Sequence, residues 1–326
     1  MKGNLVQLCD WGEKLLGEHE LAAAIHPLAA DSALRPSCAY IVSNPGKRFR
    51  AAVAFHAARY GERPNDPLVK DAAVAIELFH AATLAHDDVV DDDKMRRGKP
   101  AIGMHAGNLA ASLAGGWLFG RSVELVAAIG DEVAARFGKV AAKVCEGEIL
   151  EARDLYDSAR TRERYLAAIE AKTASLIAFS AWLGATVGGA APADAERLYG
   201  FGEAVGMAFQ IADDVLDLIA DPELTGKTAG SDLRQGLYTL PVIYALEGDE
   251  DLGKTLGRGP DEYELPGLVE RVRDAGGIEA ALRDCAAWVT RAEESLPEVD
   301  PEPEHGERLV TLAQQVIGRV GEMAPS

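Results

Sequence analysis

The sequence predicts an all-α protein, a single-domain bundle of ten or more helices spanning residues 1–326. Aromatic residues make up only 6% of the chain and alanine recurs in runs, a composition that favours helices over β-sandwiches and barrels. Apolar residues recur at the helical spacing of three and four, and no segment shows convincing strand alternation. No linker is long enough, or low enough in complexity, to mark a domain boundary.

Two segments carry the helical period most clearly. In residues 68–85, Val74, Leu78, Ala81 and Ala85 fall on one face of a helix. Residues 309–320 repeat the pattern near the other end of the chain. Glycine and proline predict breaks between helices at 61–67, 97–107, 188–192, 222–236, 248–266 and 297–306.

Residues 173–193 contain no charged side chain, and a stretch of that length could cross a bilayer. The stretch is rich in serine, threonine, glycine and alanine, and Glu170 and Lys172 stand just before it. A helix that is apolar on every side is also typical of the centre of a large bundle. We therefore expect a buried helix and no transmembrane segment.

Charge and cysteine content exclude several classes of protein. The chain has 33 Lys and Arg against 52 Asp and Glu, a net charge of -19, which argues against binding to nucleic acid or anionic lipid. Its four cysteines are scattered, with no CxxC pair and no disulfide framework, and the amino terminus has no signal-peptide core. A cytoplasmic location is the simplest expectation.

Two acidic clusters carry the chemistry. Each follows an apolar helix and has the spacing Asp-Asp-x-x-Asp; they comprise Asp87, Asp88 and Asp91, and Asp213, Asp214 and Asp217. Carboxylates four residues apart lie on one face of a helix and repel each other, so a cation is expected between them. Hard oxygen ligands without histidine or cysteine pairs favour Mg²⁺, which is usually held by carboxylates together with substrate phosphates.

Cations follow each cluster along the chain. Lys94, Arg96 and Arg97 come after the first, and Lys227 and Arg234 after the second. A charge run beside an opposite charge run is normally a solvated surface, but two ordered copies suit a diphosphate held between metal and guanidinium groups. The surrounding segments, 80–91 and 206–217, are also alike in layout.

These segments closely resemble the trans-isoprenyl diphosphate synthases, also called polyprenyl synthetases. The matching motifs run in family order: Gly-Lys-Arg-Phe-Arg at 46–50, 77–80, the first aspartate-rich motif with its Arg-Arg-Gly tail at 86–100, Lys-Thr within 170–174, the second motif at 206–217, 226–233 and 239–246. The resemblance implies the isoprenoid synthase type I fold, in which helices surround a deep central cavity, and a homodimer.

The resemblance also implies a role for each matching residue. Metal binding falls to Asp87, Asp88, Asp91 and Asp213, and less directly to Asp214 and Asp217, with about three Mg²⁺ ions when substrate is bound. An allylic prenyl diphosphate would be held by Arg96, Lys172 and Lys227, and isopentenyl diphosphate by Lys47, Arg50, His80 and Arg97. Lys172, Thr173 and Gln210 would form the catalytic region between the two substrates.

The implied reaction is a prenyl transfer. Loss of diphosphate from the allylic substrate leaves a carbocation, the double bond of isopentenyl diphosphate attacks it, and a proton is lost. In the family, the residues four and five before the first aspartate limit the length of the product. Here they are the small Thr83 and Ala82, which predicts geranylgeranyl length or longer, and Phe79, about one turn deeper, is a candidate floor or simply a core residue.

Two positions depart from the family pattern: Gly116 replaces a common aspartate and Leu237 a common lysine.

Three other functions stay open. A class I terpene cyclase has no need of a second diphosphate site, a non-catalytic subunit of a heteromeric synthase has no need of intact aspartates, and a bundle that merely binds divalent cations leaves the ordered cations unexplained.

Overall fold

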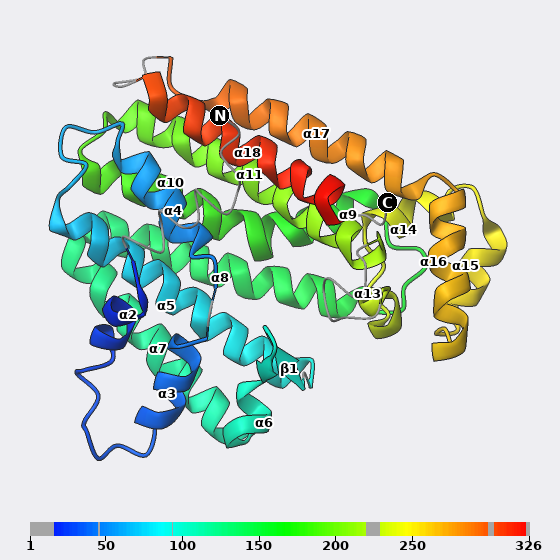
Figure 1. Cartoon of the computed structure of the whole chain (residues 1–326), viewed down its shortest axis with the longest axis horizontal. Helices are drawn as coiled ribbons and strands as arrows, with labels where there is room; N and C mark the ends of the chain where they lie inside the picture. The colour runs from blue at the N-terminus through cyan, green and yellow to red at the C-terminus, as the bar shows by residue number, and fades with distance from the viewer. Residues whose placement is uncertain (1–15, 45, 93, 220–228, 299–302, 324–326) are drawn as a thin grey trace. The chain divides into compact units, whose positions relative to one another are not determined.

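The structure is a computed structural model that describes residues 16–44, 46–92, 94–219, 229–298 and 303–323. In this part of the chain helices dominate and the sheet is one ladder of two short strands, which confirms the all-α class (Figure 1). The elements are α2 (Glu18–Ala24), α3 (Arg35–Val42), α4 (Phe49–Ala58), α5 (Pro67–Val90), β1 (Met95–Arg96), β2 (Lys99–Pro100), α6 (Ile102–Ala106), α7 (Asn108–Ile129), α8 (Asp131–Arg153), α9 (Arg162–Ile169), the π-helical turn η1 (Glu170–Ala174), α10 (Ser175–Gly188), α11 (Pro192–Ile219), α13 (Ser231–Gln235), α14 (Leu240–Leu246), α15 (Glu250–Gly257), the 3₁₀ turn η2 (Glu262–Glu264), α16 (Leu265–Asp274), α17 (Gly277–Ser295) and α18 (Pro303–Met323).

Contacts between residues divide the chain into two compact units. The first comprises residues 1–139, 179–198 and 299–308, and the second residues 140–178, 199–298 and 309–326. Each unit holds one of the two acidic clusters. The expectation of a single domain from 1 to 326, and of a central cavity shared by both clusters, stays a prediction.

Helix α5 forms the centre of the first unit, where it packs against α4 and α7. It begins at Asp66, whose side chain accepts a hydrogen bond from the Leu68 amide at 3.0 Å, with Pro67 at the first helical position. The sequence predicts a helix over 68–85, and the observed helix continues to Val90. The extra turn places Asp87 and Asp88 on the helix and Asp91 at its end.

Residues 97–107 do not form the simple break that the sequence predicts. Met95 pairs with Pro100 and Arg96 with Lys99, so β1 and β2 make a tight hairpin. The two residues at its tip, Arg97 and Gly98, both have positive φ, as a type I′ turn requires. The Arg-Arg-Gly sequence therefore folds back toward the helix that precedes it.

The second unit has its own apolar clusters. Helix α14 packs against α16 and α17, and α15 and α16 lie near it at one end of the view in Figure 1. Residues 309–320 bury their predicted apolar face, with Leu309, Leu312 and Val316 fully buried. This confirms the helix predicted there.

One helical segment in the described part of the chain, Arg162–Gly188, has the length and hydropathy to cross a membrane. Of its most apolar window, 78% is buried inside the protein. That degree of burial fits the core helix expected from its apolar composition. The helix is broken by η1, where the backbone adopts a π-helical turn at Lys172 and Thr173.

Replacement of Gly184 with alanine is expected to destabilise the protein by about 2 kcal/mol, because a Cβ there would lie 2.7 Å from Ala54 Cα and force α10 away from α4. Chemical denaturation measures the change. Gly138→Ala is the matched control: a Cβ meets nothing within 4 Å at this exposed position of α8, so alanine should stabilise the helix by up to about 1 kcal/mol. Equal effects at both positions would contradict the close packing of α10 on α4.

Candidate functional site

Asp88 of the first acidic cluster forms an ion pair with an arginine of the same unit. Arg96 Nε donates to Asp88 Oδ1 at 2.6 Å, and the Ile102 amide donates to Asp88 Oδ2 at 3.4 Å. Asp88 is 5% exposed, so its charge is compensated inside the protein. Tyr40 also holds the hairpin, through a 2.7 Å hydrogen bond from its hydroxyl to the Pro100 carbonyl. The hairpin thus carries Arg96 back to the end of α5.

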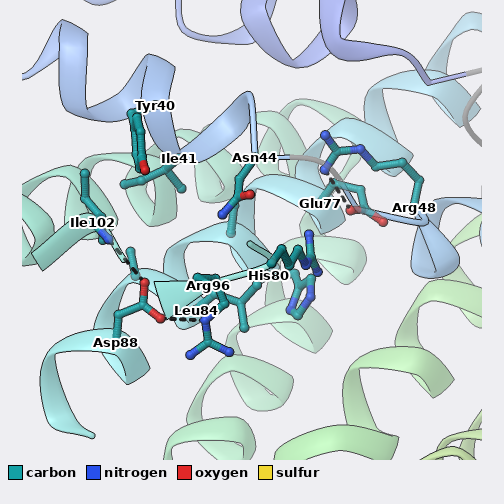
Figure 2. Close-up of a pocket in the computed structure, with 13 residues that line it drawn as sticks. Tyr40, Ile41, Asn44, Arg48, Glu77, His80, Leu84, Asp88, Arg96 and Ile102 are labelled. Atoms are coloured by element: carbon teal, nitrogen blue, oxygen red, sulfur yellow. Dashed lines mark hydrogen bonds and ion pairs between the residues drawn. The ribbon is translucent and has the colours of Figure 1, made fainter. Parts of the chain in front are cut away.

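A pocket lies between α3, α5, the hairpin and α6 (Figure 2). Figure 2 shows the Asp88–Arg96 pair on one side of His80 and the Arg48–Glu77 pair on the other. The residues that line the pocket are Tyr40, Ile41, Asn44, Arg48, Glu77, His80, Ala81, Leu84, Ala85, Asp88, Arg96, Arg97 and Ile102. Its polar lining is dominated by arginine.

The electrostatics of this pocket favour an anion. The pKa of His80 lies well below 6.5, first because of burial and then because Arg50, Arg97, Arg48 and Arg96 repel a proton on the imidazole. Burial likewise lowers the pKa of Arg50 to about 10, and its Nε is buried with no hydrogen-bond partner in the described part of the chain. A ligand with several acceptor oxygens would satisfy these groups.

Glu77 is the carboxylate that anchors the cations. It is buried, lies 3.6 Å from Arg48 and accepts a hydrogen bond from the Ala51 amide at 3.1 Å. No role was predicted for Glu77 or Arg48, although both stand inside quoted motifs. For Glu77 the available signal was a lone carboxylate in the otherwise apolar run 72–79. Lys47, which was expected to bind a substrate, is exposed and is not among the lining residues.

The Gly-Lys-Arg-Phe-Arg segment and the hairpin meet at Gly46. A Cβ at this position would lie 2.9 Å from the Arg97 Cζ, so the guanidinium packs directly on the glycine backbone. The structure therefore brings Arg50, His80, Arg96 and Arg97 together, as the sequence predicts. Their binding of substrate stays a prediction.

The second acidic cluster is tied into a chain of hydrogen bonds. The Thr173 hydroxyl donates to Gln210 Oε1 at 2.8 Å, and Gln210 Nε2 donates to Asp214 Oδ1 at 2.8 Å. The Tyr165 hydroxyl donates to Asp214 Oδ2 at 2.6 Å. Both oxygens of Asp214 are thus engaged by neutral donors, and the carboxylate holds Gln210 toward Thr173. The sequence gave no signal for Tyr165, because it is 49 residues away from Asp214 along the chain and the two meet only in the folded protein.

Burial and neighbouring carboxylates also shift the titration of the second cluster. Burial raises the pKa of Asp214 to about 8, and repulsion from Asp213 and Glu151 adds to the effect. Burial and then repulsion by Asp217 raise the pKa of Asp232 well above its usual value, and the Asp232 amide donates to Asp217 Oδ2 at 3.1 Å. Asp232 stands in a quoted motif, but its spacing to the cluster gave no signal.

Lys172 is held by two glutamates of α8. Its Nζ lies 2.8 Å from Glu148 Oε2 and also contacts Glu151 Oε2. Neither glutamate was singled out from the sequence, although both lie three residues apart on one helix face. Lys227, the other expected ligand of an allylic diphosphate in this unit, lies outside the described residues.

The described residues contain no group of three or more His, Cys, Asp or Glu side chains arranged to enclose a metal ion. The donor set nevertheless fits a hard divalent cation, because Mg²⁺ usually takes one or two carboxylates and completes its shell with water and phosphate oxygens. Asp91 and Asp213 are exposed, and Asp87 and Asp217 are partly so. Burial, and after it repulsion by neighbouring carboxylates, raises the pKa of Asp214 and Asp232, and a bound cation would favour the charged form of both.

The residues expected to limit product length lie in the first unit. Ala82 is buried, and the Thr83 hydroxyl donates to the His80 carbonyl of its own helix at 2.9 Å. Phe79 is 3% exposed and contacts two further rings, Phe119 at 5.6 Å and Phe137 edge-on at 5.1 Å between centroids. Phe79 is therefore part of an aromatic cluster; its role as a floor stays a prediction.

The two departures from the family pattern have different surroundings. A Cβ at Gly116 would meet nothing within 4 Å, whereas one at the neighbouring Gly115 would lie 2.6 Å from His86 Nε2. Leu237 is partly buried, and its amide donates to the Asp232 carbonyl at 2.8 Å. The structure gives no reason for either replacement.

Comparison with known proteins gives consistent matches. The family model described as polyprenyl synthetase matches residues 31–267. Heptaprenyl diphosphate synthase component 2 of Geobacillus stearothermophilus is 40% identical over 265 residues, which cover 80% of this chain and 82% of that protein. Nonaprenyl diphosphate synthase of Mycobacterium tuberculosis is 34% identical over 298 residues, 90% of this chain and 88% of that protein.

Solved structures agree in fold. Polyprenyl synthase from Caulobacter crescentus, crystallised with calcium and isoprenyl diphosphate, matches with a TM-score of 0.87 at 30% identity and covers 98% of this chain and 99% of its own. Heptaprenyl diphosphate synthase from Staphylococcus aureus matches with a TM-score of 0.86 at 29% identity, over 98% of this chain and 99% of its own.

Stability is expected to fall as the pH drops below about 6.5, and His80 should be one cause. Its folded pKa is depressed, so below pH 6.5 the unfolded chain takes up a proton that the folded chain refuses, and unfolding is favoured. In His80→Gln, the loss of unfolding free energy between about pH 7.5 and about pH 5.5 should be smaller by about 1 kcal/mol. Urea denaturation at both pH values measures it; an unchanged loss would argue against a neutral His80.

Proposed function

This chain belongs to the polyprenyl synthetase family and is a prenyltransferase, and on that premise we propose the reaction that its own residues catalyse. The enzyme condenses isopentenyl diphosphate with an allylic prenyl diphosphate and releases diphosphate. The product is a trans-polyprenyl diphosphate of geranylgeranyl length or longer. The family match confirms the resemblance inferred from the motifs and the type I fold that it implied.

The cationic pocket of the first unit is the observation that carries this proposal. Arg48, Arg96 and Arg97 line it together with His80, and the carboxylates of its lining are Glu77 and Asp88. Arg50 is not a lining residue, but it lies near enough to His80 to lower the pKa of the imidazole. A positive surplus of this kind, with each carboxylate of the lining paired to an arginine, suits a diphosphate bound without metal. Isopentenyl diphosphate is that substrate. A terpene cyclase, which uses a single diphosphate, has no use for such a pocket.

The allylic diphosphate binds, in this proposal, at the two aspartate clusters together with Mg²⁺. Asp87, Asp88, Asp91 and Asp213 hold the ions. Asp214 and Asp217 act less directly: both oxygens of Asp214 accept hydrogen bonds from Tyr165 and Gln210, and one oxygen of Asp217 accepts from the Asp232 amide. Neutralisation of the leaving diphosphate is the chemistry that bound Mg²⁺ supplies. Arg96, Lys172 and Lys227 add cationic contacts to the same diphosphate.

The remaining chemistry needs no dedicated base. Asp214 accepts a hydrogen bond from Gln210, which in turn accepts one from Thr173, so the three side chains are oriented together. The oxygen dipoles of Thr173 and Gln210 stabilise the allylic cation. The double bond of isopentenyl diphosphate attacks the cation, and the released diphosphate accepts the proton. Apolar helices keep water away from the cation.

Small residues at Ala82 and Thr83 leave the growing chain room to pass α5. The aromatic cluster of Phe79, Phe119 and Phe137 then stops it, in our proposal. The two named relatives are heptaprenyl and nonaprenyl diphosphate synthases, products longer than geranylgeranyl. Their names support the longer end of the range.

We further propose that the enzyme is a cytoplasmic homodimer that associates through α7. Leu109, Leu113 and Val123 are 75%, 52% and 39% exposed and follow one helix face with Gly116 and Gly120. A second copy could cover this face closely, since a Cβ at either glycine meets nothing within 4 Å. The relative named as component 2 points to a heteromeric partner as the alternative. Sedimentation of the purified chain distinguishes a dimer from a monomer that lacks its partner.

Incubation of the pure protein with Mg²⁺, isopentenyl diphosphate and farnesyl diphosphate should yield elongated diphosphates, and chelation of the metal should abolish them.

Arg50→Gln should raise the KM for isopentenyl diphosphate by at least about tenfold, because a charge-assisted hydrogen bond is lost. The KM for the allylic substrate should change little. Arg63→Gln, at a side chain 65% exposed, is the matched control. Cyclic hydrocarbons, or no product, would refute the proposed reaction.

Phe79→Ala should lengthen the product, because it removes the ring against which Phe119 and Phe137 pack and opens space below α5. Chromatography of the dephosphorylated products measures the length. Phe201→Ala, at a buried phenylalanine of α11 in the other unit and outside the quoted motifs, serves as a control for the general loss of an aromatic side chain. An unchanged product distribution in Phe79→Ala would rule out its role as a floor.

A further inference from the structure

Helix α8 forms ion pairs with both charged side chains of the π-helical turn η1. Lys143 of α8 pairs with Glu170, and Glu148 and Glu151 of α8 pair with Lys172. Between these contacts the two backbones touch, because a Cβ at Gly147 would lie 2.7 Å from the Lys172 Cα. The position of Lys172 is therefore fixed from outside its own helix.

The Lys172 ammonium carries one positive charge, and the two carboxylates beside it carry two negative charges. Its side chain is 27% exposed, and Glu151 and Glu148 raise its pKa against the opposing effect of burial. An ammonium has three N–H donors. With one donor directed to each of the two glutamates, one donor is left for a further oxygen. The two carboxylates together outweigh the single positive charge.

The contacts of Lys172 set two carboxylates, Glu148 and Glu151, against one ammonium. The described contacts of Lys172 therefore have a net negative charge. A free anion approaching Lys172 would meet both glutamates as well as the ammonium. This is the reverse of the arginine-rich pocket around His80.

We propose that Glu148 and Glu151 are positioning residues that hold Lys172 and cancel its charge, so that this half of the site accepts a diphosphate only together with divalent cations. The proposal rests on the proposed function, since it concerns the Lys172 site for the allylic diphosphate. It assigns the metal requirement to two glutamates outside both aspartate motifs. Their two contacts leave the third N–H of Lys172 to a phosphate oxygen once cations have offset the negative charge.

Binding of inorganic pyrophosphate, with and without Mg²⁺, tests this by isothermal titration calorimetry. Glu148→Gln, Glu151→Gln and the double variant keep the shape of both side chains and remove their charge. Each is measured with Lys172 present and in a Lys172→Gln background. The arginine-rich pocket is unchanged in every variant, so its own binding of pyrophosphate cancels in the comparison.

Without metal, the double variant should bind pyrophosphate at least about tenfold more tightly than the wild type, the scale of a partly screened contact between charges. The gain should vanish in the Lys172→Gln background. With saturating Mg²⁺, the affinities of the wild type and the double variant should differ by much less. The single variants should show part of the gain, which keeps the test valid if the double variant does not fold.

Glu146→Gln is the matched control, since Glu146 is an exposed glutamate on the same helix. An equal gain in this variant, a gain that persists without Lys172, or no gain at all would overturn the proposal. A purely structural role would lower the melting temperature without changing metal-free binding. The elongation assay is independent of this test. A protein that elongates the allylic substrate but shows no Lys172-dependent gain in pyrophosphate binding refutes this inference alone. A protein that shows the gain but forms no elongated product refutes the proposed reaction.

Discussion

The ion pair between Asp88 and Arg96 is the interaction on which the arginine-rich pocket of the first unit depends. A carboxylate that is 5% exposed needs a partner, and removal of one member of a buried pair costs about 3–5 kcal/mol. The partner comes from a hairpin whose turn places Arg97 at positive φ, next to Gly98. By binding Arg96, Asp88 brings Arg97 against Gly46 and completes the wall of arginines around His80.

In our proposal, the two units bind a diphosphate with opposite charges. Around His80, the nearby arginines disfavour a proton on the buried imidazole, so the pocket would bind an anion directly. Around Lys172, Glu148 and Glu151 outweigh the single ammonium, so an anion would bind there together with metal ions. Charge alone would then direct two chemically similar substrates to different places.

Sequence patterns predicted the helices well where burial is periodic. The helix at 309–320 appears with its apolar face buried, and the helix before the first cluster was underestimated only at its polar end, where the aspartates carry no apolar period. The hairpin at 95–100 was missed because two-residue strands are too short to alternate. Of the expected site residues, Thr173 and Gln210 do meet, whereas Lys47 is exposed and is not among the residues that line the arginine-rich pocket.

The sequence by itself determined the fold class, the family and the positions of both acidic clusters, because these depend on periodicity and on residues close together in the chain. Only the tertiary structure decided which partner each charge has. Glu77 anchors Arg48, Tyr165 holds Asp214 from 49 residues away, and Glu151 binds Lys172. A buried charge must find an opposite charge or a donor wherever the packed helices supply one, and that choice is not written in local sequence.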